Sequence, residues 1–187
     1  MAKSPRMHEH FAHENKIVFV TTNVDENFNL FTNDAFCLIL WDELFYYAGE
    51  YNVDLLAFVI MPEHLHCLIW PQGEKIFSDY IRGVKSHSAK LILEHLNRRG
   101  PLTSPSARPG QGTRPMKGEG NKYPTRRISD QTDRIWQPGL FPYLIGDTNK
   151  LEEKLEYIKN NLVEAGLVEK PEDYQWLYVN PKIFEIE

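Results

Sequence analysis

The stretch VDLLAFVIMPEHLHCLIW, residues 53–70, decides the fold. Residues 53–60 and residues 64–70 are two runs of β-branched, aromatic and other apolar residues, and only the tripeptide MPE separates them. Runs of this composition predict strands, and a connection this short joins only antiparallel neighbours. The stretch therefore predicts a β-hairpin.

The rest of the chain supplies strands and helices on both sides of this hairpin. Two more strands are expected at residues 16–24 and at residues 135–145, the second broken at Pro138 and Gly139. Three helices are expected at residues 34–51 with Asn33 as N-cap and Gly49 near the C-cap, at residues 77–96, and at residues 149–165 with Gly166 as the C′ residue. This order predicts an α+β fold of the ferredoxin-like kind, with helices packed on an antiparallel sheet.

Composition indicates a single domain. The 187 residues are 42% hydrophobic and 25% charged, which provides enough apolar material for a core without disulfides. Cys37 and Cys67 lack the spacing of a disulfide framework, so we expect buried thiols in a reducing compartment. The sequence shows neither a signal-type segment nor a long apolar run, which predicts a cytoplasmic protein without a membrane partner.

Positive charge is concentrated in one segment. Residues 98–127 hold eight basic residues and one acidic residue, a net charge of +7, which leaves −12 for the rest of a chain whose total is −5. The segment also holds five of the twelve prolines and five of the eleven glycines. We therefore expect a flexible basic insertion, reaching to about residue 134. It either attracts the DNA backbone or is a disordered loop without that role.

His64 and His66 are the first candidates for chemistry. Residues two apart on a strand point to the same side, so the two imidazoles lie together while Leu65 points to the opposite face. Two adjacent imidazoles can bind a metal ion, but ordinary core or edge histidines produce the same short pattern. A third ligand elsewhere in the chain would favour the metal site.

The last expected helix offers such a ligand. Tyr157 and Asn161 lie off its apolar stripe, one turn apart on a flank, with Lys154 a turn earlier on the same side. A tyrosine hydroxyl is a nucleophile and an amide oxygen is a ligand for a hard cation. The alternative is a half-buried tyrosine beside a solvated asparagine. Tyr143 is a rival nucleophile, but no ligand-type residue follows it at helical spacing.

Two strings resemble a known family. MPEHLHCLIW resembles the MPxHxH signature of the single-tyrosine HUH transposases, the insertion-sequence-200-like superfamily. LEYIKNNLVEAGLVEKPEDYQW resembles their C-terminal block, in which a polar metal ligand follows a nucleophilic tyrosine by four residues. The ending is most similar to the REP-associated tyrosine transposases, although Glu63, Leu162 and residues 177–178 depart from that subgroup's pattern.

The resemblance implies a metal-dependent transposase that cleaves and rejoins single-stranded DNA at hairpin-bearing ends. It implies a 5′-phosphotyrosine intermediate on Tyr157 and an Mg²⁺ or Mn²⁺ ion bound by His64, His66 and Asn161. The subgroup resemblance favours a monomer over a homodimer. The candidate DNA-binding residues are basic; they are Arg82, Lys85 and Lys90 on the exposed face of the second helix, together with Lys154, Arg126 and Arg127.

Other interpretations remain open at this point. The chain could be a catalytically idle, domesticated protein that binds DNA hairpins, or a dimeric insertion-sequence transposase. An unrelated metallohydrolase would use His64 and His66 without needing Tyr157. The basic face of the second helix is equally explained as a solvated surface, and Trp136 is a core residue rather than a base-stacking one.

Overall fold

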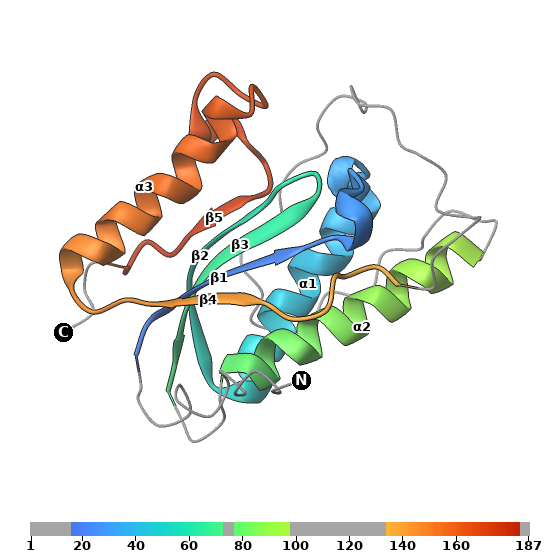
Figure 1. Cartoon of the computed structure of the whole chain (residues 1–187), viewed down its shortest axis with the longest axis horizontal. Helices are drawn as coiled ribbons and strands as arrows, with labels where there is room; N and C mark the ends of the chain where they lie inside the picture. The colour runs from blue at the N-terminus through green and yellow to red at the C-terminus, as the bar shows by residue number, and fades with distance from the viewer. Residues whose placement is uncertain (1–15, 73–76, 98–133, 184–187) are drawn as a thin grey trace, which may run out of the picture.

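The computed structural model describes residues 16–72, 77–97 and 134–183 (Figure 1). Its strands and helices are β1 (Val18–Asn23), α1 (Asp34–Tyr51), β2 (Val53–Ile60), β3 (His64–Pro71), α2 (Phe77–Asn97), β4 (Phe141–Leu144), α3 (Thr148–Glu164) and β5 (Leu177–Val179). Short 3₁₀ turns lie at Asp25–Asn27, Leu30–Thr32 and Pro171–Asp173. The expected basic insertion falls almost entirely outside the described residues.

The strands form one antiparallel sheet in the order β4-β1-β3-β2-β5. The predicted hairpin is β2 and β3, and β3 lies in the middle of the sheet. The strands β1 to β4 and the helices α1 and α2 have the connectivity of the predicted ferredoxin-like fold, which is confirmed. The strand β5 adds an edge next to β2.

Helices cover both faces of the sheet (Figure 1). Side chains alternate along each strand, so Val20 and Cys67 pack with α1 and α2, whereas Phe19 and Leu68 pack with α3. The apolar stripe of α3 is buried on that second face and consists of Leu151, Leu155, Ile158 and Leu162. Two hydrophobic cores therefore share one sheet, and β3 contributes to both.

The helix α1 spans the predicted residues, but its C-cap is a different residue from the one predicted. The Asn33 side chain accepts a hydrogen bond from the Ala35 amide and caps the first turn. Gly49 does not end the helix as expected, because the residue in the left-handed conformation is Asn52, with φ at 51°. Asparagine tolerates this conformation, and its N–H bonds to the last carbonyls of the helix.

The turn between β2 and β3 is fixed from two sides. The Met61 amide donates to the His64 carbonyl at 2.8 Å, which closes the hairpin. The Glu63 carbonyl accepts a hydrogen bond from the Val24 amide, just after β1, also at 2.8 Å. These bonds set the start of β3, where the histidines lie.

The segments after the insertion return to the core. Trp136 is buried, as predicted, and its indole N–H donates to the Ser88 hydroxyl at 3.1 Å. The predicted break before β4 occurs at Gly139, which has φ at 82°.

Both free cysteines are buried, and burial raises the pKa of Cys67 to about 12. Among the described helices, none combines the length and apolar character needed to span a lipid bilayer.

Candidate active site

The two histidines of β3 face α3. His66 is 3% exposed and the His64 side chain is 19% exposed, and their Nε2 atoms are 2.9 Å apart. Leu65, between them, packs in the opposite core. The period-2 geometry predicted from the sequence is therefore present, and the two imidazoles meet through the same ring nitrogen.

The second nitrogen of each ring has its own partner. Nδ1 of His64 donates to the carboxylate of the preceding residue, Glu63, at 2.9 Å, and this bond lowers the pKa of the Glu63 carboxyl. Nδ1 of His66 lies 2.8 Å from the hydroxyl of Thr21, its cross-strand neighbour on β1. Bonds of this kind fix the orientation of metal-binding imidazoles and leave Nε2 for the metal.

The environment keeps His66 neutral. Burial, with smaller effects from His64 and the Lys154 ammonium, lowers the pKa of His66 to about 3. Only a neutral imidazole has a lone pair to give to a metal. His66 is therefore available as a ligand across the physiological pH range.

This donor set fits a divalent metal ion. Two nitrogen ligands at right angles around an octahedral ion are about 3 Å apart, and the two Nε2 atoms are separated by 2.9 Å. Within the described residues, no group of three or more His, Cys, Asp or Glu side chains gathers to hold an ion. Ions such as Mg²⁺ complete their coordination with water and phosphate oxygens, so the protein need not supply every ligand.

Tyr157 of α3 reaches the histidines from the facing helix. Its ring lies edge-on to the His66 ring, with 5.3 Å between centroids, and edge-on to the Phe19 ring at 5.8 Å. The side chain is 43% exposed, since the next residue, Ile158, turns fully into the core. Burial of Ile158 thus leaves the tyrosine at the open margin of the site.

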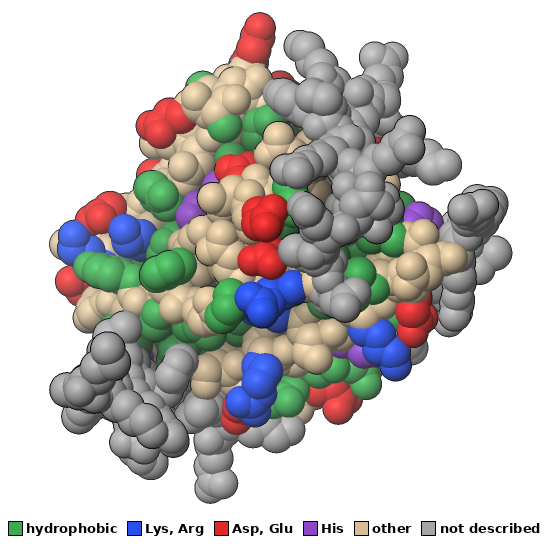
Figure 2. All heavy atoms as spheres, turned by 45° about the vertical axis from the view of Figure 1, so that its right-hand side comes forward, with side chains coloured by type: hydrophobic (Ala, Val, Ile, Leu, Met, Phe, Trp, Pro, Cys, Tyr) green, Lys and Arg blue, Asp and Glu red, His purple; other side chains and the backbone are tan. Residues whose placement is uncertain are grey.

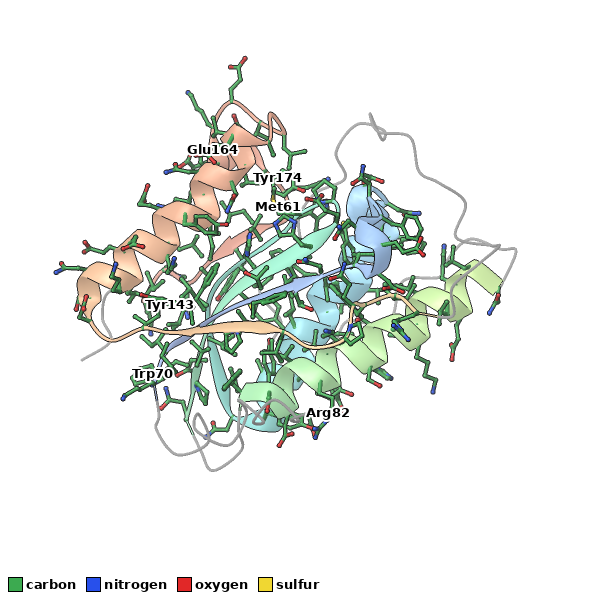
Figure 3. The ribbon with its side chains drawn as sticks, viewed as in Figure 1. Met61, Trp70, Arg82, Tyr143, Glu164 and Tyr174 are labelled. Carbon is green, nitrogen blue, oxygen red and sulfur yellow. The ribbon has the colours of Figure 1, made fainter. Side chains whose placement is uncertain are left out.

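Lys154 lies among three aromatic rings. Its Nζ atom is 5.3 Å from the centroid of the Tyr157 ring, 5.5 Å from Phe19 and 4.9 Å from Tyr143 on β4. Figure 3 shows Tyr143 between β4 and α3. The side chain of Lys154 is 19% exposed, and the nearest carboxylate, of Glu153, is 3.6 Å away. A positive charge is therefore held beside both tyrosines of this face.

Asn161 is near Tyr157 in the chain but does not join the histidine pair. Its amide nitrogen donates to the Tyr157 carbonyl at 2.9 Å, one turn back in α3. Among the described residues it hydrogen-bonds neither His64 nor His66. Its Oδ1 atom accepts no protein hydrogen bond there and is the atom that would serve as a ligand.

The basic residues of α2 lie on the opposite side of the sheet. Arg82 is exposed and pairs with Asp79, and Lys90 is exposed. Lys85 is half-buried rather than exposed as predicted, because its ammonium donates to the carbonyls of Gln137 and Gly139 at 2.8 and 2.6 Å. Burial lowers the pKa of Lys85 to about 8. Lys85 therefore holds the segment before β4.

The described residues on the face shown in Figure 2 form no large basic patch. On the face shown in Figure 2, basic side chains of the described residues are scattered among acidic ones. A groove of about 570 Å³ lies between α2 and residues 134–140, with Arg82, Lys85 and Arg134 in its lining. Arg126 and Arg127, predicted to bind DNA, lie outside the described residues.

Sequence reasoning missed three residues of this site and identified a fourth, Tyr143, only as a rival nucleophile. Thr21, Glu63, Phe19 and Tyr143 support the histidines or surround Lys154. Glu63 could have been found, because it directly precedes His64. The other three meet the site only through strand register and helix packing, which no local pattern encodes.

The family model described as "Transposase IS200 like" matches residues 9–106, more than half of the chain. The chain belongs to the IS200-like transposases. The matched region contains β1 to β3, α1 and α2, and so includes both histidines. It ends before α3, so Tyr157 lies outside the part of this IS200-like transposase that the family model covers.

Two solved structures were compared with this transposase. A REP-associated tyrosine transposase bound to a REP hairpin matches with a TM-score of 0.63 and 18% identity, over 95% of this chain and 82% of that chain. A candidate transposase from Deinococcus radiodurans matches with a TM-score of 0.45 and 15% identity, over 84% of this chain and 98% of that chain. A search of curated proteins found no match. The first similarity confirms the expected fold over nearly the whole chain.

Proposed function

We propose that this transposase cleaves and rejoins single-stranded DNA through a covalent bond to Tyr157. The observation that carries the proposal is the contact between the Tyr157 and His66 rings, with 5.3 Å between centroids. A nucleophile has to lie where the scissile phosphate is bound. The tyrosine lies against the one imidazole pair in the described residues that could hold a phosphate-binding metal.

The reaction exchanges one phosphate ester for another. The phenolic oxygen of Tyr157 attacks a backbone phosphorus, and the bond from that phosphorus to the 3′ oxygen breaks. The 3′-OH leaves with a proton, and the 5′ phosphate remains esterified to the tyrosine. Rejoining reverses these steps and needs no ATP, because the ester bond is conserved.

His64 and His66 would hold Mg²⁺ or Mn²⁺, with Asn161 as a third candidate ligand. The ion would offset the negative charge that develops on the phosphate. Either the ion or Lys154, whose ammonium is 5.3 Å from the centroid of the Tyr157 ring, would assist the nucleophile. Phe19 packs against both His66 and Tyr157 and would hold the two rings in position relative to each other.

DNA hairpins are the proposed partner. Membership of the IS200-like family supports DNA as the substrate, and the similar REP-associated transposase was solved with a REP hairpin. Arg82 and Lys90 are exposed and remain candidates for backbone contacts, together with Arg126 and Arg127. Lys85 is a weaker candidate, since two carbonyls already occupy its ammonium. We place the reaction in the cytoplasm, as the sequence suggests.

The tyrosine and the histidines come from the same chain. In dimeric members of the superfamily the tyrosine helix can serve the partner's histidines, which was the alternative raised by the sequence. Here α3 packs on its own sheet through Leu155 and Ile158, and Tyr157 meets His66 directly. A monomer requires this arrangement, and the proposal of a monomer rests on the subgroup resemblance.

Covalent capture tests the proposal. Single-stranded hairpin DNA labelled at its 3′ end is incubated with the protein and Mn²⁺ and separated on a denaturing gel. The wild type and Tyr143→Phe should form a labelled protein band, whereas Tyr157→Phe or added chelator should abolish it. A band with Tyr157→Phe would contradict the proposal, and hairpin binding without any band in the wild type would favour the catalytically idle alternative.

A further inference from the structure

Strand β4 presents two aromatic side chains beside the candidate active site. Phe141 is 66% exposed, the highest value among the large hydrophobic side chains described, and Tyr143 is 43% exposed. They are two residues apart on the strand, so both point to the same face of the sheet. They lie on the face of the sheet against which α3 packs, and Lys154 of α3 lies close to both Tyr143 and Tyr157.

The strand register ties these rings to the site. Phe141 pairs with Thr21 on β1, and Thr21 pairs with His66 on β3. Phe141 is thus in the same cross-strand row as His66, two strand spacings or about 10 Å away. Tyr143 occupies the next row of the same face, opposite Phe19.

A cation accompanies the rings. The Lys154 ammonium is 4.9 Å from the Tyr143 ring centroid and 5.3 Å from the Tyr157 ring centroid. Aromatic rings next to a positive charge are the usual means of binding single-stranded nucleic acid, since the rings stack on bases and the charge attracts phosphates. A protein partner would need an interface of about 20 residues, far more than this short edge strand provides.

We propose that Phe141 and Tyr143 form a stacking platform for unpaired bases of the DNA strand next to the scissile phosphate. This inference rests on the proposed function, because it assigns the path of the same substrate. Side chains two positions apart on a strand are separated by about 7 Å, which leaves room for one planar base between two rings. The platform selects unpaired over paired bases, whose faces are already stacked, and tolerates any base sequence.

Binding measurements on full-length protein test the platform. All variants carry Tyr157→Phe and chelator is present, so that no cleavage occurs. Fluorescence anisotropy compares a short oligodeoxythymidine with an abasic strand of the same length and a duplex. Phe141→Ala should weaken binding of the oligodeoxythymidine about tenfold and leave the abasic strand and the duplex unchanged. Phe141→Trp, which keeps an aromatic ring, should bind the oligodeoxythymidine as tightly as the protein with Phe141.

Tyr46→Ala is the matched control. Tyr46 is an aromatic residue of α1 with 39% exposure, on the other side of the sheet, and its removal should change none of the three affinities. Equal losses for the oligodeoxythymidine and the abasic strand would overturn the platform, as would an unchanged affinity. A change in molecular mass with Phe141→Ala would also overturn it and identify β4 as a self-association edge.

This result is separable from covalent capture. Loss of base-dependent binding in Phe141→Ala does not depend on which tyrosine reacts. If the wild type forms no covalent band but the platform binds bases, only the strand-transfer chemistry fails. If the band forms and Phe141→Ala binds normally, only the platform fails.

Discussion

Toward α1 and α2 the central strand presents Leu65 and Cys67, whereas toward α3 it presents His64 and His66. Residues next to each other on this strand therefore point to opposite faces, and at residues 64–67 one face receives imidazoles and the other apolar side chains. The α1 and α2 side is a large apolar core. The α3 side has a smaller core and, at its margin, imidazoles, a hydroxyl and a cation among aromatic rings.

Each side also contains a histidine paired with a carboxylate. His87 of α2 lies 2.8 Å from the buried Glu43 of α1, and His64 lies 2.9 Å from Glu63. The first pair has the Tyr47 ring 6.2 Å from His87, but only the second has another imidazole against it among the described residues. A histidine and carboxylate pair is therefore no indication of a site unless further ligands converge on it.

Replacing one histidine on each side should give the largest contrast. His66→Ala removes a proposed metal ligand, so we expect the rate of DNA cleavage to fall about a thousandfold or more. His87→Ala leaves the buried Glu43 carboxylate without this partner, so it should lower the melting temperature but not the rate per folded molecule. Cleavage rates measured below the melting temperatures of both variants separate a loss of catalysis from a loss of stability. Similar rate losses in the two variants would contradict the assignment of His66 as a metal ligand.

Cavities in the two cores should differ in their effect on catalysis. Leu40 and Ile158 are both fully buried, the first in α1 and the second next to Tyr157 in α3. Leu40→Ala and Ile158→Ala should each lower the free energy of unfolding by about 2–5 kcal/mol. Only Ile158→Ala should also slow cleavage, because it loosens the turn that carries the nucleophile. Denaturant unfolding and cleavage rates test this, and an equal slowing in both variants would contradict it.

Much of the fold was predictable because it depends on local patterns. The β2 and β3 runs, the Asn33 cap and the Gly166 stop are all encoded within a few residues. The bounds of α1 were predicted, but its C-cap was misjudged because asparagine competes with glycine for the left-handed position, and Asn52 follows Gly49 by only three residues. The strand β5 forms through long-range pairing with β2, which no local pattern predicts.

The charge of Lys154 should contribute less than the metal ligands. Lys154→Met keeps the length of the side chain and removes the cation beside Tyr157, so we expect cleavage to slow about tenfold. Lys159→Met is the control, since Lys159 pairs with Glu156 on the same helix without contacting the cluster of rings. An unchanged rate would remove Lys154 from the mechanism.

The candidate site was only partly predictable. The spacing of His64, His66 and Tyr157 within the sequence motifs predicted the residues that the structure brings together. The position of Lys85 could not be predicted, because its carbonyl partners are more than fifty residues away in the chain. Thr21 and Tyr143 likewise reach the site only through the register of β1 with its two neighbours.

Removing a helix N-cap should give the smallest change in stability, and the change should be the same for α1 on one side of the sheet and α3 on the other. Asn33 caps α1 and Asp147 caps α3, each by accepting a backbone amide hydrogen bond. Asn33→Ala and Asp147→Ala should each cost about 1 kcal/mol of stability. Neither should change the cleavage rate, because Tyr157 lies about two and a half turns from the start of α3. A loss of cleavage rate in Asp147→Ala alone would contradict this and show that the first turn of α3 affects the position of Tyr157.

Mapping the modified residue tests the chemistry of the α3 side most directly. The covalent complex is treated with nuclease and trypsin, and the peptides are weighed. Cleavage after basic residues places Tyr157 in the peptide of residues 155–159 and Tyr143 in that of residues 135–150. We predict a nucleotide phosphate on the peptide of residues 155–159. A nucleotide on the peptide of residues 135–150, or on neither, would contradict the assignment of Tyr157 as nucleophile.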